Sequence, residues 1–176
     1  VDVDCAGDCG GSAVEDDCGV CEGNGTSCLS ADISFGSIVE GEDGVTVDVL
    51  YSSNSPIGGF QFNVSGFNVL SGTASDAGFT VSNSGNTIVG FSFTGASLPA
   101  GDNLLLVTLD VEVTDTEGCL SDEIISNVSG LQISSSVGSC SDLPCNPDCA
   151  DVCNGDSVED CAGTCGGDAE VLACGC

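Results

Sequence analysis

The chain has 176 residues and a formal net charge of −28, because its 28 aspartates and glutamates are opposed by no lysine, arginine or histidine. Without cations it has no surface for phosphate, which excludes a nucleic-acid partner and disfavours anionic membranes. Without histidine or lysine it has no Ser-His-Asp triad, histidine metal ligand or Schiff base, so we do not expect an enzyme.

Fourteen cysteines in a chain of this length are typical of a disulfide scaffold. Cys18 and Cys21 form one C-x-x-C pair, but no second pair follows at a zinc-ribbon spacing. We therefore expect oxidised cysteines and an extracellular or cell-surface location. We expect no membrane insertion, since no apolar run reaches the roughly 18 residues of a spanning helix.

The cysteines divide the chain into three predicted parts: a Cys-rich acidic repeat at 1–28, a β-sandwich at 29–139, and further Cys-rich acidic repeats at 140–176. The cysteines predicted to form disulfides are Cys5, Cys9, Cys18, Cys21, Cys28, Cys119, Cys140, Cys145, Cys149, Cys153, Cys161, Cys165, Cys174 and Cys176.

The first part opens with a short repeat that recurs near the other end. Residues 4–11 (DCAGDCGG) recur as residues 160–167 (DCAGTCGG) and, more loosely, as residues 148–155 (DCADVCNG). Gly, Asp and Cys leave little apolar surface to bury, so disulfides and bound ions must replace a hydrophobic core. We expect little regular secondary structure here. The pattern resembles the tandem D-C-x-G-x-C-G-G repeats of large secreted and cell-surface proteins.

The middle part is rich in Val, Ile, Phe and Thr, and several segments alternate; Phe60, Phe62 and Val64, for example, share one face. Short, evenly spaced strands predict an all-β fold, an antiparallel β-sandwich, with a hairpin loop at 83–86. The predicted strands cover 33–39, 45–51, 57–64, 79–82, 87–93, 104–113 and 131–134.

Two segments of the middle part resemble strands of cohesin-like domains. They are residues 57–64 (IGGFQFNV) and residues 98–109 (LPAGDNLLLVTL). The resemblance covers about residues 31–138 and implies a jelly-roll sandwich. In that family the sandwich hosts dockerin binding, carbohydrate binding and scaffolding, so the resemblance alone does not choose a function.

Cysteine parity constrains the pairing. The first part holds five cysteines and the rest of the chain nine, both odd numbers. If every cysteine is oxidised within the chain, at least one bridge joins the first part to the rest, and we predict Cys28 with Cys140 or Cys145. The alternative is an intermolecular disulfide. We also predict that Cys119 pairs with Cys140.

A compact fold of this chain must tolerate the repulsion between carboxylates, spread them over its surface or recruit cations from outside, and calcium takes 6–8 oxygen ligands. No segment matches an EF-hand, and a solvated acidic surface is the competing interpretation of any single cluster. An aspartate precedes a cysteine in each repeat, which favours calcium in the outer parts. The predicted calcium ligands are Asp2, Asp4, Asp8, Asp16, Asp17, Asp148, Asp151, Asp156, Asp160 and Asp168.

Two functional hypotheses follow. The first is an extracellular structural protein, a subunit of a calcium-dependent, disulfide-stabilised filament that assembles head to tail with copies of itself. The second is a cohesin-like recognition module of a larger surface protein that binds a dockerin or a glycan. Asn24, Asn63 and Asn127 match the N-glycosylation sequon and are candidate modification sites.

Overall fold

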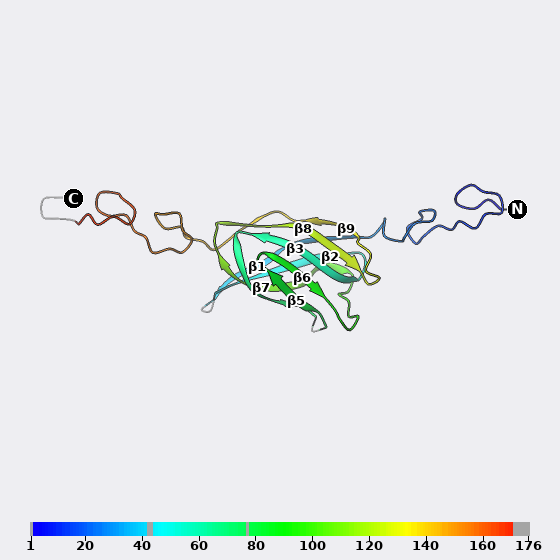
Figure 1. Ribbon diagram of the computed structural model, residues 1–176, viewed down its shortest axis with the longest axis horizontal. Helices are drawn as coiled ribbons and strands as arrows, with labels where there is room; N and C mark the ends of the chain where they lie inside the picture. The colour runs from blue at the N-terminus through cyan, green and yellow to red at the C-terminus, as the bar shows by residue number, and fades with distance from the viewer. Residues whose placement is uncertain (1, 42–43, 77, 171–176) are drawn as a thin grey trace.

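The computed structural model describes residues 2–41, 44–76 and 78–170, and within them regular secondary structure consists of β-strands (Figure 1). The strands are β1 (Ser30–Gly41), β2 (Gly44–Ser53), β3 (Ile57–Ser65), β4 (Phe67–Ala74), β5 (Thr80–Ser84), β6 (Thr87–Phe91), β7 (Gly101–Val113), β8 (Glu117–Asn127), β9 (Ser134–Val137) and β10 (Ser141–Asp142). No helix in this described part is long and apolar enough to cross a membrane.

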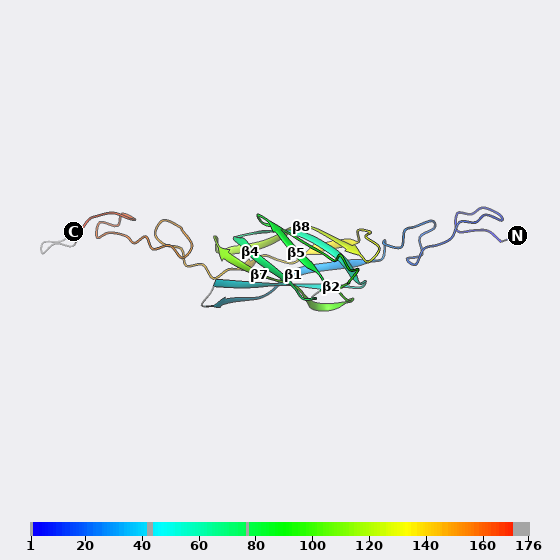
Figure 2. The same cartoon turned by 60° about the horizontal axis from the view of Figure 1, so that its bottom comes forward.

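The strands form two five-stranded sheets, in the orders β4-β7-β2-β1-β9 and β10-β8-β3-β6-β5. Neighbouring strands run antiparallel except β1 and β9, which pair in parallel. The sheets pack face to face, which confirms the predicted all-β, jelly-roll-type sandwich (Figure 2).

The core lies between the two sheets and follows the alternation of the sequence. β3 buries Phe60, Phe62 and Val64 on one face, as predicted. The ring centroids of Phe60 and Phe62 lie 6.0 Å apart. Gly90 on β6 faces the Phe60 ring, and a Cβ there would overlap it. Burying one such aromatic side chain contributes about 1.5–3 kcal/mol.

All seven predicted strands overlap observed ones, but the segment 131–134 shares only Ser134 with β9, which begins there. The predicted hairpin loop is confirmed. β5 ends at Ser84 and β6 begins at Thr87, and Gly85 in the turn has a positive φ of 58°. β4 and β8 are strands that the pattern did not predict.

Two arms without regular strands extend from the sandwich: the N-terminal arm, residues 2–29, and the C-terminal arm, residues 144–170. They leave at opposite ends of the sandwich in both views (Figures 1 and 2). The predicted bridge from Cys28 to Cys140 or Cys145 is therefore wrong. Cys28 pairs with Cys18 in its own arm, whereas Cys140 pairs with Cys119 on β8 and Cys145 with Cys153 in the C-terminal arm.

Candidate functional site

Disulfides occur in both arms and at one place in the sandwich. The predicted pair Cys119–Cys140 is confirmed, with a Cα–Cα distance of 4.3 Å. The arms hold Cys5–Cys21, Cys18–Cys28, Cys145–Cys153 and Cys149–Cys165, and Cys161 is also disulfide-bonded. Such a framework is typical of secreted proteins.

Cys9 departs from the prediction that all cysteines are oxidised, since it carries a free, exposed thiol. The predicted Cys174 and Cys176 lie outside the described residues.

The arms are built from a repeating unit organised by one aspartate. In the unit of Asp16, Oδ1 accepts the backbone N–H groups of Cys18 and Val20, both at 2.9 Å. Oδ2 accepts the N–H of Gly25 at 2.7 Å. The three donors stand two, four and nine residues after the aspartate, so one carboxylate holds a whole loop together.

The same three bonds recur at Asp4, Asp148 and Asp160, from N–H groups at the same offsets and at distances between 2.8 and 3.2 Å. We call these four residues the frame aspartates and number their units 1 to 4 along the chain. Each arm holds two units whose aspartates are twelve residues apart.

The N–H donors lower the pKa of each frame aspartate below its ordinary 3.8. The largest contribution to the lowered pKa comes from the backbone N–H of the residue four positions after the aspartate, which is Asp8 for Asp4 and Thr164 for Asp160. Partial desolvation acts in the opposite direction but is outweighed. Bonds to the charged form favour ionisation, so these carboxylates are stable as anions without a cationic side chain.

The glycines of the repeat have two different tasks. Gly10 and Gly166 have positive φ, and Glu22 in the equivalent position of unit 2 also has a φ of 53°. The following glycines are needed for space, because a Cβ there would overlap Oδ2 of the frame aspartate in the same unit. These closely approached glycines are Gly11, Gly23, Gly155 and Gly167.

Consecutive units within an arm are joined by a disulfide. Cys5–Cys21 joins units 1 and 2, and Cys149–Cys165 joins units 3 and 4. Both bonds have a sequence separation of 16 and a Cα–Cα distance of 5.5 Å. Each joins the cysteine directly after one frame aspartate to the cysteine five residues after the next.

The predicted calcium ligands fall into two groups. The four frame aspartates are half-buried and direct their oxygens at backbone N–H groups. The others are exposed: Asp2, Asp8, Asp17, Asp151, Asp156 and Asp168. Across the described residues, no three of these carboxylates bring oxygens within 4.8 Å of one another. Calcium binding here stays a prediction, and the loop-forming role of the frame aspartates is one that the sequence reasoning missed.

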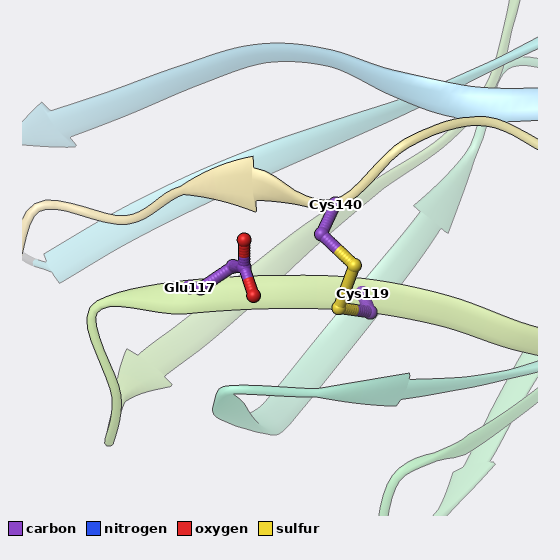
Figure 3. A group of neighbouring side chains, drawn as sticks. All are labelled: Glu117, Cys119 and Cys140. Atoms are coloured by element: carbon purple, nitrogen blue, oxygen red, sulfur yellow. A yellow bond between two sulfur atoms is a disulfide. The ribbon is translucent and has the colours of Figure 1, made fainter.

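One other group of potential metal ligands lies on the sandwich, where Glu117 approaches Cys119 and Cys140 (Figure 3). The two sulfurs are bonded to each other, so neither is a thiolate. Because metal ligation by cysteine uses the thiolate, this group is a carboxylate beside a disulfide and not a metal site.

An aromatic pair, the half-buried Phe91 and the exposed Phe93, lies at the end of β6. Ile88 and Gly90 of β6 face the core, so Phe91 faces outward. Its ring meets that of Phe93 edge to face, with centroids 4.9 Å apart. Phe93 is 85% exposed, unlike the core phenylalanines. An apolar ring pair on the surface can contact a partner.

The three sequons differ in their surroundings. Asn24 is exposed in the N-terminal arm, and its Oδ1 accepts the hydroxyl of Thr26 at 2.7 Å. Asn63 lies within β3 and donates to Asp122 at 2.9 Å. Asn127 ends β8, and its Oδ1 accepts two N–H groups of the following turn.

No protein-family model and no curated protein sequence matches the chain. Among solved structures, it is similar to CaCohA2 from Clostridium acetobutylicum, at 19% identity and a TM-score of 0.44 over 67% of this chain and 90% of that one. A non-cellulosomal cohesin from the archaeon Archaeoglobus fulgidus gives 16% identity and 0.42 over 67% and 90%. The sixth cohesin of Acetivibrio cellulolyticus scaffoldin B, solved with a dockerin, gives 14% and 0.44 over 65% and 98%.

Proposed function

We propose that this chain is a non-enzymatic extracellular or cell-surface structural protein, a subunit of a disulfide-stabilised fibre that assembles head to tail with copies of itself. One observation carries the proposal: two arms built from the same unit leave the sandwich at opposite ends (Figure 1). A contact between the N-terminal arm of one copy and the C-terminal arm of the next leaves an equivalent contact open at each end. Such heterologous contacts continue into a filament.

The arms suit a connecting role because each unit is stabilised locally. A frame aspartate and a disulfide replace the apolar core that Gly, Asp and Cys cannot supply. Disulfides join consecutive units within each arm, as expected of a repeat array that can be lengthened by further units.

Calcium is part of the proposal because of the charge. Two carboxylates about 4 Å apart repel by about 1 kcal/mol in water, and arms that meet bring many of them together. The exposed aspartates, unlike the frame aspartates, have carboxylates directed to solvent. Shared calcium ions between arms of neighbouring copies would offset this repulsion.

Electron microscopy of the native, unreduced protein with millimolar calcium, and again after EGTA, tests the proposal. Filaments that fray on chelation are the expected result. Filaments that are unchanged by EGTA contradict the role of calcium but support assembly. Monodisperse particles under both conditions overturn assembly.

A charge-matched pair of variants places the calcium sites. The test variant neutralises three exposed aspartates of the C-terminal arm, and the control neutralises three exposed acids of the sandwich. The test variant is D151N/D156N/D168N, and the control is D102N/E112Q/D142N. We expect the calcium dependence of assembly to disappear only in the test variant. Equal behaviour of the two means that the calcium effect is a general screening of charge.

The surface pair of Phe91 and the exposed Phe93 favours a second function, a recognition module that binds a dockerin or a glycan. Dockerin and glycan panels probed with the full chain and with the F91A/F93A variant test it. Saturable binding that the variant lacks supports recognition by this face. Absence of binding by the full chain, or equal binding by the variant, contradicts it.

A further inference from the structure

Cys9 is the free thiol in the described part of the chain, and it occupies a defined place in unit 1. It stands five residues after the frame aspartate Asp4. The cysteines at the same place in units 2, 3 and 4 are Cys21, Cys153 and Cys165. All three of them are disulfide-bonded.

The backbone around Cys9 matches that of its bonded equivalents. Cys9 forms an isolated antiparallel bridge with Val3, the residue before the frame aspartate. The same bridge occurs in the other three units, to Cys21, Cys153 and Cys165. Unit 1 is thus folded as the others are, and its cysteine lacks only the partner.

The bonded equivalents also show which cysteine the partner is. In every case it precedes the unit of the bonded cysteine: Cys5 for Cys21, Cys145 for Cys153 and Cys149 for Cys165. Where two full units follow each other, the partner comes directly after the preceding frame aspartate. The sequence printed here contains no cysteine before Cys5, so this position is not filled from within it.

We infer that Cys9 is a covalent attachment site for the cysteine of a further Asp-Cys unit. That unit comes from a second copy of the chain, whose own disulfide to the Asp-Cys cysteine is exchanged for the bond to Cys9, or from residues preceding these in a longer polypeptide. In either case, the bond continues the ladder of inter-unit disulfides by one step. Only the first source rests on the proposed assembly.

With a second copy, the Cys9 thiolate attacks the copy's existing disulfide, forms the new S–S bond and releases the former partner cysteine as a thiolate, which takes up the proton. With a preceding unit, the bond forms by oxidation of two thiols with an external disulfide as the oxidant. The thiolate of one cysteine attacks that disulfide, forming a mixed disulfide and releasing one thiol. The thiolate of the second cysteine then displaces the other half of the oxidant. One new S–S bond and two reduced thiols result, and the protons lost by the cysteines reside on the released thiols.

Disulfide mapping of the native, unreduced protein tests the inference. Free thiols are alkylated with iodoacetamide, and the chain is cut with pepsin at acidic pH, since it offers trypsin no site and acid suppresses thiol exchange. We expect Cys9 unalkylated, in a peptide joined to an Asp-Cys peptide. Alkylated Cys9, or Cys9 joined to a cysteine of the same molecule, overturns the inference.

Two further measurements distinguish a second copy from a preceding unit as the source of the partner cysteine, and distinguish the Cys9 attachment site from the proposed fibre assembly. When ¹⁴N and ¹⁵N protein are mixed, reduced and reoxidised, a bond between copies gives hybrid peptides, whereas a preceding unit gives a partner peptide of foreign sequence. Cys9→Ser then reduces the covalent dimer on a non-reducing gel to background. Filaments with a free Cys9 overturn only the attachment site. A bonded Cys9 without filaments overturns only the assembly.

Discussion

The Cys119–Cys140 disulfide allows a quantitative test of how the sandwich is stabilised. It closes a loop with a sequence separation of 21, which contains β9 and most of β8. Cross-linking a loop of this length removes about 11 cal/mol/K of unfolded-chain entropy, or about 3 kcal/mol at 25 °C. Cys119 is half-buried and Cys140 exposed, so serine at both positions loses little packing. We expect C119S/C140S to lower the free energy of unfolding by about 3 kcal/mol.

Urea denaturation of the unreduced protein, followed by the fluorescence of Tyr51 in the core, measures this change. For a sandwich spanning residues 30–142, the same loss lowers the melting temperature by roughly 12 °C. The control is C5S/C21S, which removes an arm disulfide and leaves the unfolding of the sandwich within about 0.5 kcal/mol of wild type. A loss below about 1 kcal/mol in C119S/C140S, or equal losses in both variants, refutes the reasoning.

Further predictions concern the arms. Folding lowers the pKa of Asp160 below 3.8, so the ionised carboxylate stabilises its unit above pH 3.8, and this stabilisation is lost as the pH falls through the lowered pKa. The carboxyl ¹³C chemical shift of Asp160, followed by NMR, should therefore titrate with a midpoint below 3.8. A midpoint at or above 3.8 contradicts this prediction. Asp160→Asn replaces Oδ2 by an amide nitrogen that cannot accept, so hydrogen exchange at the Ala169 N–H should accelerate while unit 3 is unchanged. The methyl group added in Gly167→Ala should displace the Asp160 carboxylate, so hydrogen exchange should accelerate at all three backbone N–H groups that it accepts. Unchanged exchange at these three groups would show that the glycine is not needed for space. In a glycosylating secretory host, mass spectrometry should find the glycan at Asn24 and not at Asn63, whose side chain donates a hydrogen bond to Asp122 of β8. The reverse pattern contradicts this.

The sequence predicted the strands in which apolar side chains alternate and missed those in which they do not. β3 buries every second residue, and its pattern alone identified it. β8 contains Glu117, Asp122 and Glu123, and its buried residues are irregularly spaced around a register shift with β3. β4 ends in small and polar residues at the edge of its sheet. Pairing with β3 and β7, which no local pattern contains, makes these segments strands.

The repeats were found from the sequence, but the task of their aspartates was not. An aspartate beside a cysteine fits a calcium ligand and an acceptor of backbone N–H groups equally well by composition. Two signals separate the two tasks in retrospect. The frame aspartates recur every twelve residues within an arm, and a glycine follows each by seven residues, as Gly11 follows Asp4. That spacing marks a carboxylate packed against backbone, whereas a calcium loop needs several carboxylates converging on one point.

The disulfide pairing was predicted least well, for a related reason. If every cysteine is oxidised within the chain, parity requires a bridge from the first part to the rest. The structure instead pairs Cys5 with Cys21 and Cys18 with Cys28 inside the N-terminal arm and leaves Cys9 free, while the two arms lie at opposite ends of the sandwich (Figure 1). The N-terminal arm thus has an odd number of cysteines because a unit's cysteine pairs with a cysteine that precedes the unit, and the first unit has none before it in this sequence.

The direction of this pairing is the link between the fold and the proposed assembly. Units 2 and 4 take a disulfide partner from the unit before them, so the two ends of an arm are unlike. A sandwich with termini on one side would bring these ends together within one molecule. This sandwich sends them apart, so the polarity of the repeat becomes the polarity of the whole subunit (Figure 1). A subunit with unlike ends joins others in only one orientation, which is the condition for a head-to-tail fibre.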